Sequence, residues 1–298
     1  MTTLPWLWVV FTVIAAAAQT VRNAMQRELT GSIGTLGATH VRFLFGFPFA
    51  LVFLTGVVLW TGAPLPRPSW TFWLWVCDGS AAQIAATALM LAAMGERSFV
   101  VTIAYIKTEP IQVAVFGLIF LGDVVTLPMM IAIVVATSGV VIMSTKPGGM
   151  VGGIKPTLLG LASGGMFALS AIGYRGAILN LGLPNYLMSA TFTLAVGLVV
   201  TTVMLSSYLV VRAPSVMPAI MHVWRRSLFA GFMGAFASQF WFLAFALATA
   251  ASVRTLALIE VLFAQLVARF AFGQRTTPRE SIGMVLVVAG VVLLILAY

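Results

Sequence analysis

One pattern of residues occurs twice in this chain of 298 residues, at a constant separation of 151 positions. Glu109 is matched by Glu260 in this register. Four further landmarks repeat without a gap, namely Gly46 and Gly197, Gly122 and Gly273, Thr126 and Thr277, and Gly139 and Gly290. A register of this length predicts two halves of related structure. Each half carries one glutamate inside a strongly apolar stretch, which is typical of proteins built from two membrane-embedded repeats.

The composition predicts an integral membrane protein. Hydrophobic residues make up 61% of the chain, charged residues only 8%, and the mean hydropathy is +1.09. Soluble domains carry about a quarter charged residues, so a soluble globule could not bury this much apolar surface. The net charge of +9 does not indicate nucleic-acid binding, because the basic residues lie mostly at the ends of apolar runs. No metal site or internal disulfide is predicted, since His40 and His222 are far apart and Cys77 is alone.

Hydropathy divides the chain into ten apolar runs, each close to the roughly 20 residues that a spanning helix needs. The breaks between runs carry glycine and proline, as at Gly182 to Pro184. A glycine-rich, basic stretch from Lys146 to Pro156 separates the halves, which we place at 1–147 and 148–298. The predicted fold is therefore all-α, with spans at 5–27, 35–60, 70–94, 98–121, 125–145, 156–178, 184–210, 226–248, 251–272 and 279–298.

The first run has a second interpretation, because it ends in Ala15 to Ala18 and so resembles a signal peptide with a small-residue cleavage site. The segment from Met1 to Pro5 lacks the basic residues of a signal peptide. Removal of this run would also leave nine spans and break the five-plus-five pattern. We therefore favour a retained first helix.

The distribution of lysine and arginine predicts the orientation. Of the 16 basic residues, twelve lie in or beside odd-numbered loops, three lie at the even side, and Lys107 lies within a run. Loops rich in basic residues stay in the cytoplasm, so the odd loops are predicted inside and both termini outside. Because five is an odd number, the second half is then inserted upside down relative to the first. The expected architecture is two inverted five-helix repeats.

Short motifs in several runs resemble a known family. Phe116 to Asp123, which follows Glu109-Pro110, is similar to the repeat of the drug/metabolite transporter superfamily, specifically its ten-helix EamA-type members. His40 to Phe45 resembles the second helix of that repeat, and Ile282 to Gly290 resembles the fifth. The resemblance covers essentially the whole chain.

The resemblance implies export or uptake of small metabolites, with amino acids prominent among them. It implies a bacterial inner (plasma) membrane location and no cofactor. It also implies a central cavity lined by the first, third and fourth helices of each repeat. Two positions depart from the family pattern: Val261 stands where the second repeat often has proline, and Gln274 where an acidic residue commonly follows the glycine.

The helices expected to face this cavity carry polar side chains at helical spacing. Candidate substrate-binding residues are Gln19, Arg22, Asn23, Gln83, Thr87, Lys107, Ser170, Tyr174, Gln239 and Phe242. The plainer interpretation of the serines and threonines is contact between helices, because their hydroxyls hydrogen-bond across membrane interfaces. For the three glutamines the two interpretations stay open.

Charges inside the apolar runs are sharper evidence, since a charge near the bilayer centre costs at least about 2.5 kcal/mol and persists only with compensation. Lys107 and Glu109 lie about ten residues into the fourth run, Glu260 lies at the matching point of the ninth, and Arg254 lies near the start of that run. Lys107 and Glu109 are two residues apart and point to different sides of a helix. We therefore expect pairing between the halves, of Glu109 with Arg254 or of Lys107 with Glu260.

Two roles compete for these charges. As a clamp, they would hold the halves together. As a functional site, Lys107 and Arg22 would attract a carboxylate or phosphate, while Glu109 or Glu260 would carry a coupling proton or receive a substrate ammonium. The sequence assigns Arg42 to the basic-inside bias or to snorkelling at the membrane surface.

These features predict a secondary transporter that works by alternating access, with an amino acid as the first candidate cargo and a phosphorylated or nucleotide-linked anion as the second. No GxxxxGK[ST] motif indicates use of ATP. A membrane-embedded enzyme would show clustered carboxylates or a histidine-based nucleophile site, and a channel would show a continuous polar lining, so both are less favoured. Direction of transport and oligomeric state stay open.

Overall fold

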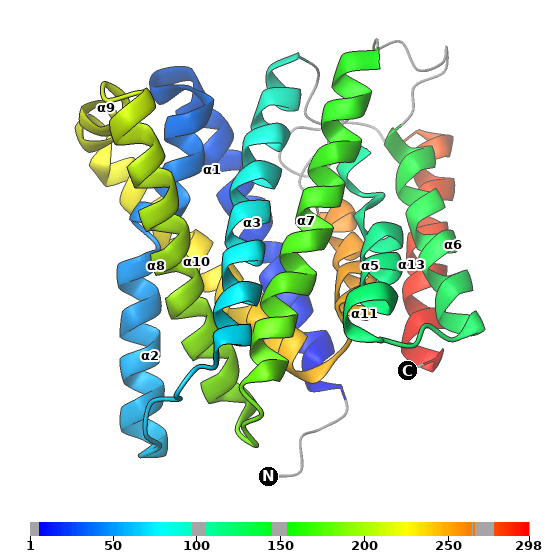
Figure 1. Ribbon diagram of the computed structural model, residues 1–298. Helices are drawn as coiled ribbons and strands as arrows, with labels where there is room; N and C mark the ends of the chain where they lie inside the picture. Colours follow the sequence, from blue (N-terminus) through cyan, green and yellow to red (C-terminus); the bar gives the residue numbers. More distant parts are fainter. Residues whose placement is uncertain (1–5, 97–104, 145–153, 264, 266–276, 298) are drawn as a thin grey trace.

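The computed structural model describes residues 6–96, 105–144, 154–263, 265 and 277–297. This part of the chain is built of helices and contains no strand (Figure 1). Its elements are α1 (Leu7–Leu44), α2 (Phe47–Thr61), α3 (Trp70–Glu96), α5 (Glu109–Leu121), α6 (Leu127–Ser144), α7 (Ile154–Asn180), α8 (Tyr186–Arg212), α9 (Val216–His222), α10 (Trp224–Leu247), α11 (Ala250–Leu256), the short 3-10 turn η1 (Ala257–Ile259) and α13 (Pro278–Ala297).

Six helical stretches in the described residues are long and apolar enough to cross a membrane. They are 7–61, 70–93, 157–180, 186–212, 224–247 and 278–297. Two shorter apolar helices, at 109–121 and 127–143, accompany them. The described part of the protein is therefore all-helical, with the long apolar helices of a multi-pass membrane protein.

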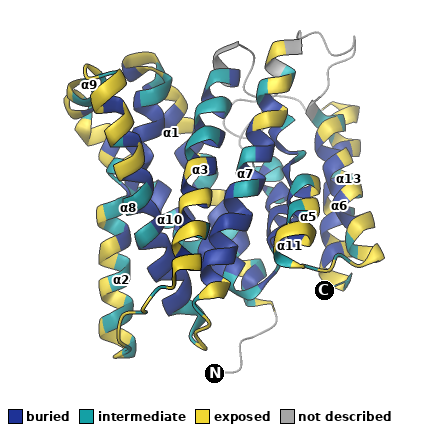
Figure 2. Ribbon diagram, viewed as in Figure 1, coloured by how far each residue is buried: buried dark blue, intermediate teal, exposed yellow. Residues whose placement is uncertain are grey.

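The outer surface of the bundle is apolar, as a membrane environment requires. Leu59 on α2, Val211 on α8 and Leu296 on α13 are each exposed by more than three quarters. Figure 2 shows exposed residues along the outer faces of α2, α6 and α13, with buried residues gathered in the middle of the bundle. Soluble monomers rarely expose contiguous apolar patches of this extent.

The first stretch, 7–61, folds back on itself at Gly34. The backbone there has φ 71° and ψ 174°, a conformation that is strongly unfavourable for any residue other than glycine. The side-chain amide of Gln26 donates to the carbonyl oxygen of Ala38 at 2.9 Å, whereas a straight helix would separate residues twelve apart by about 18 Å. The chain therefore rises along 7–33 and returns along 35–61, with a short interruption at Phe45 and Gly46.

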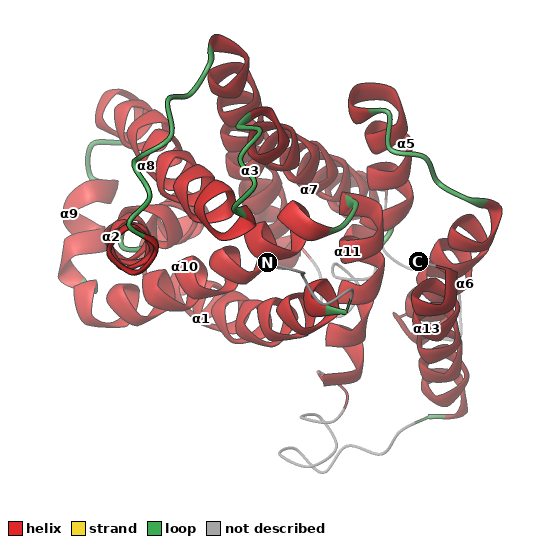
Figure 3. Ribbon diagram, turned by 90° about the horizontal axis from the view of Figure 1, so that it is seen from below, coloured by secondary structure: helices red, strands yellow, loops and turns green. Residues whose placement is uncertain are grey.

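Three pairs of helices make the most extensive contacts, namely α3 with α7, α1 with α10, and α6 with α13. Each pair lies side by side in the view from below (Figure 3). In each pair one helix comes from 1–147 and the other from 148–298. The pairing therefore joins the two halves of the sequence throughout the bundle.

Small residues allow this close approach. A Cβ added at Gly139 of α6 would lie 2.6 Å from the carbonyl oxygen of Gly283 on α13. One added at Gly290 of α13 would lie 2.8 Å from the carbonyl oxygen of Ala132 on α6. Backbones in membrane bundles pack closely at such positions.

The helices that carry the buried charges are interrupted, where the sequence predicts continuous spans at 98–121 and 251–272. Lys107 and Thr108 form a turn, and α5 begins only at Glu109. Pro110 in the first turn of α5 fits this start, because it has no backbone N–H to pair. In the second half η1 interrupts the helix just before Glu260, without a proline. The predicted end of that span lies outside the described residues.

Candidate functional site

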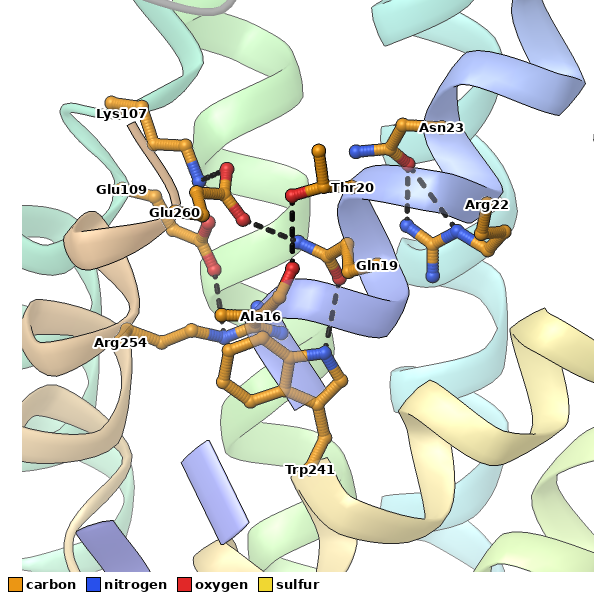
Figure 4. Close-up of polar contacts among 10 residues, drawn as sticks. All are labelled: Ala16, Gln19, Thr20, Arg22, Asn23, Lys107, Glu109, Trp241, Arg254 and Glu260. Atoms are coloured by element: carbon orange, nitrogen blue, oxygen red, sulfur yellow. Dashed lines mark hydrogen bonds and ion pairs between the residues drawn. The ribbon is translucent and has the colours of Figure 1, made fainter. Parts of the chain in front are cut away.

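Two ion pairs lie at the centre of the bundle, and each joins the two halves of the chain. The guanidinium Nε of Arg254 lies 3.0 Å from the Glu109 carboxylate. The Lys107 ammonium contacts the Glu260 carboxylate. All four side chains are buried. Both pairings expected from the sequence therefore form (Figure 4).

The interrupted helices set this arrangement. Lys107 lies in the turn before α5, and Glu109 is the first residue of that helix. Arg254 lies on α11, and Glu260 follows η1. A turn between Lys107 and Glu109 lets each side chain reach a different partner on the opposing half. The charges are thus held between the halves and not within either one.

Gln19 of α1 links this cluster to an aromatic wall. Its amide Nε2 donates to Glu260 at 3.4 Å, and its Oε1 accepts from the indole N–H of Trp241 at 3.0 Å. The Arg254 guanidinium lies 4.6 Å from the centre of the Trp241 ring, within the range of a cation–π contact. Both polar ends of the Gln19 amide are therefore used (Figure 4). Trp241 is a site residue that sequence reasoning did not select.

Arg22 is nearly inaccessible, with 1% of its surface exposed. Its Nε and Nη2 donate to the side-chain oxygen of Asn23 at 3.3 and 2.7 Å. Its Nη1 is buried without a hydrogen-bond partner. A buried guanidinium with a free donor is costly, and it is a ready partner for an anion.

Two cavities adjoin at this centre and share Gln19, Phe167 and Arg254. The larger is lined by Gln19, Arg42, Phe43, Gln83, Phe167, Tyr174, Leu194, Leu198, Ser238, Trp241, Phe242, Phe245 and Arg254. The other is lined by Gln19, Arg22, Asn23, Met90, Ile106, Lys107, Glu109, Phe167, Arg254 and Glu260.

The polar stripe predicted on the third span contacts α7. The hydroxyl of Ser170 donates to the side-chain oxygen of Gln83 at 3.1 Å, and the Gln83 amide lies 3.3 Å from the Thr87 hydroxyl. Tyr174 bonds Ser80 and Thr201, each at 3.3 Å. Of the predicted residues, Gln19, Gln83, Tyr174 and Phe242 line the larger cavity, whereas Thr87 and Ser170 hydrogen-bond Gln83 and line neither cavity.

Gln239 is not brought to either cavity. Its amide donates to the hydroxyl of Thr191 on α8 at 2.7 Å. This contact between helices is the plainer of the two interpretations offered for the buried glutamines.

Arg42 was assigned to the membrane surface, and the structure corrects this. The residue is 5% exposed and lines the larger cavity. Its Nη1 donates to Thr87 at 3.4 Å, and its Nε is buried without a partner. The fold-back at Gly34 brings the start of the returning helix into the bundle, which the local sequence does not reveal.

Arg175, near the end of α7, is also buried. It pairs with Asp123 through Nε at 3.2 Å and Nη2 at 3.3 Å. Its Nη1 donates to the carbonyl oxygens of Phe245, at 2.6 Å, and Ala248. One side chain thus ties the segment after α5 to α7 and to the turn between α10 and α11. No repeated motif marks Arg175, so the sequence gives no signal for it.

Among the described residues no group of three or more His, Cys, Asp or Glu side chains could hold a metal ion.

Comparison with known proteins supports the fold alone. No family model and no curated protein matches the sequence. One solved structure, named "Crystal structure of protein", has 13% sequence identity and a TM-score of 0.73. The match covers 99% of this chain and 98% of the other. Helix arrangement is therefore shared over the full length of both proteins, at an identity too low to carry function.

Proposed function

We propose that the protein is a secondary transporter of the EamA type in the drug/metabolite transporter superfamily. Its cargo is a small polar metabolite bearing an anionic group, moved by alternating access through the central cavities. The observation that carries this proposal is the cluster of buried charges that joins the two halves beside those cavities. Charges are kept inside a membrane bundle chiefly where they line a substrate or ion path.

Reciprocal contacts support a two-fold relation between the halves, which the proposed inverted repeat requires. Gly139 meets Gly283, and Ala132 meets Gly290. Adding 151 to 132 and 139 gives 283 and 290, so the second contact is the first with the halves exchanged. This exchange is the signature of a two-fold axis.

A second contact pair, on other helices, obeys the same rule. The Gly46 Cβ position lies 3.3 Å from the carbonyl oxygen of Gly231, and the Ser80 hydroxyl lies 3.4 Å from the carbonyl oxygen of Gly197. Adding 151 to 46 and 80 gives 197 and 231, so the second contact is again the first with the halves exchanged. An approximate two-fold axis through the centre supports two gates of similar construction.

The ion pairs follow this symmetry approximately. Glu109 takes its cation from the second half and Glu260 takes its cation from the first. In the 151 register the counterpart of Arg254 is position 103, four residues before Lys107 in the sequence and outside the described residues. Rocking one half against the other would strain or exchange these pairs. Protonation of Glu109 or Glu260 would release Arg254 or Lys107, which is how a coupling proton would act.

An amino acid is the first candidate cargo, and a phosphorylated or nucleotide-linked anion is the second. The carboxylate of an amino acid, or a phosphorylated organic anion, could accept hydrogen bonds from the free Nη1 of Arg22. Trp241, Phe242 and Phe167 supply apolar surface for the rest of the molecule. By the basic-inside bias we place the odd loops in the cytoplasm of a bacterial cell.

Transport by purified protein in lipid vesicles tests this proposal. Counterflow of radiolabelled amino acids and phosphorylated anions is expected to saturate with concentration. Arg22→Gln should reduce it, whereas Arg226→Gln, in an exposed pair with Glu28, should not. Flux that rises linearly without saturation would indicate a channel, and the absence of counterflow for every solute would overturn the transporter assignment.

A further inference from the structure

Two arginines meet at one point of the candidate site. A Cβ added at Gly234 of α10 would lie 3.1 Å from Cγ of Arg42 and 3.5 Å from Cδ of Arg22. These two carbon atoms are therefore no more than 6.6 Å apart, the sum of the two distances. The fold-back at Gly34 brings the arginines together, although twenty residues separate them. Glycine at position 234 leaves the space that both side chains occupy.

Neither arginine forms a salt bridge with an acidic residue whose side chain the structure describes. Six of the seven acidic residues have described side chains. Glu28 and Asp123 pair with Arg226 and Arg175, and Glu280 accepts from the backbone of Thr277. Asp78 is exposed and lines neither cavity.

The remaining two acids, Glu109 and Glu260, are already matched by Arg254 and Lys107. Arg22 and Arg42 thus leave two positive charges unbalanced among the described groups at the centre. Each also has one buried guanidinium nitrogen without a hydrogen-bond partner. Uncompensated charge in a membrane interior is unfavourable unless a ligand supplies the opposite charge.

We propose that Arg22 and Arg42 together bind one small organic dianion, a dicarboxylate with one carboxylate on each arginine. This proposal rests on the transporter assignment above and names the cargo class for the same site. The planar guanidinium matches a carboxylate through two parallel hydrogen bonds. Arg22 lines one cavity and Arg42 the adjoining one, so the two anionic groups would be separated by a short carbon chain.

The apolar side chains that line the two cavities are suited to an organic ligand. Phe167 lines both cavities, Ile106 and Met90 line the one with Arg22, and Leu194 lines the one with Arg42. A neutral zwitterion fits less well, because both buried glutamates are already paired and no other carboxylate among the described residues lines either cavity to receive its ammonium. A single inorganic anion would neutralise only one arginine and would leave this apolar surface uncovered.

Equilibrium binding to the detergent-purified protein tests the proposal without any assumption about transport. Three probes at neutral pH are compared by calorimetry: succinate, its monoamide succinamate, and L-alanine. Succinamate keeps the carbon chain and removes one charge. Succinate is expected to bind about tenfold or more tightly than either of the others, since each charged contact contributes about that much. Equal affinities for succinate and succinamate in the wild-type protein would overturn the proposal.

Variants of the protein test whether Arg42 binds the second carboxylate of succinate. Arg42→Gln should lower succinate affinity about tenfold or more and leave succinamate affinity nearly unchanged, because only the dianion uses both guanidiniums. Arg226→Gln, on the exposed surface, is the matched control and should change neither affinity. Tighter binding of glycerol 3-phosphate than of succinate would overturn the separated-charge geometry in favour of a phosphate site.

The outcomes also separate this inference from the transporter assignment. Succinate that binds through both arginines but shows no counterflow in vesicles would support the site and contradict transport. Saturable counterflow of L-alanine, with no binding of succinate, would support transport and overturn the dianion site.

Discussion

At the scale of single residues, the central ion pairs combine two demands on the same side chains. Lys107 and Glu260 are buried, so each charge needs the other to remain stable in the bundle. They also line a cavity, where a ligand could compete for either group. Stability and transport should respond differently when one or both partners are replaced.

Replacement of Glu260 alone by glutamine is expected to lower the free energy of unfolding by about 3–5 kcal/mol, because it leaves the Lys107 ammonium buried without its partner. The double variant Lys107→Met, Glu260→Gln should recover most of that loss. Thermal unfolding in detergent measures both effects. The exposed pair of Arg226 and Glu28 is the control, and its replacement should cost about 1 kcal/mol or less.

Transport by the double variant decides between the two roles. A stable double variant that still transports would identify the pair as a clamp between the halves. A stable double variant without transport would place the pair in the substrate or proton path. A double variant as unstable as Glu260→Gln would contradict the electrostatic account of the single change.

The sequence predicts these pairs but not the arginine pair, for a physical reason. Lys107 and Glu109 are two residues apart and were expected on different sides of a helix, so each required a partner in the other half. Arg42 lies near the start of the predicted span 35–60, where a basic residue is expected at the membrane surface. Only the fold-back at Gly34 and the space at Gly234 bring it inside, and both are properties of the packed chain.

At the scale of elements, helix boundaries depend on groups that hydropathy does not measure. The apolar runs predict α3, α7, α8 and α10 closely. They miss the interruptions before Glu109 and Glu260, because a turn at a charged site does not change the mean hydropathy of its surroundings. The contacts between helices likewise depend on the positions of small residues, which the mean hydropathy of a run does not reveal.

The contact between α6 and α13 gives a prediction at this scale. Alanine at Gly139 would place its Cβ 2.6 Å from the Gly283 carbonyl oxygen, and alanine at Gly290 would place it 2.6 Å from the Ala136 backbone nitrogen. Each change forces the helices apart, and should cost about 1–3 kcal/mol of unfolding free energy. Because the positions are related by 151, the two losses should be similar.

Gly56 on α2 provides the matched control, since a Cβ added there meets no atom within 4 Å. Gly56→Ala is expected to be neutral or to stabilise the helix by about 1 kcal/mol or less. Unfolding in detergent compares the three variants. Losses confined to one of Gly139→Ala and Gly290→Ala would contradict the reciprocal packing.

At the scale of the whole molecule, the two halves share a sequence register but differ in the residues that they place at the centre. Arg22, Arg42 and Gly234 correspond in the 151 register to Gly173, Thr193 and Gln83 of the other half. The arginine pair therefore has no counterpart across the approximate two-fold axis. The repeat accounts for the helix arrangement, and the departures from it account for the chemistry of the centre. Cargo recognition is accordingly harder to predict from the repeat than the fold is.

The inverted arrangement makes a prediction that one labelling experiment can decide. Pro64 follows α2 and Ser215 precedes α9, both are exposed, and they are equivalent positions in the 151 register. The basic-inside bias places Pro64 outside the cell and Ser215 in the cytoplasm. A parallel repeat would place both on the same side.

Pro64→Cys and Ser215→Cys, each made in a Cys77→Ala background, are treated with a membrane-impermeant maleimide. In right-side-out vesicles Pro64→Cys should react and Ser215→Cys should not, and inside-out vesicles should reverse the result. The Cys77→Ala protein without a new cysteine should remain unlabelled. Reaction of both cysteines from the same face would mean that an even number of crossings separates them. The halves would then be parallel, and the charges at their interface could not serve two gates related by an axis in the membrane plane.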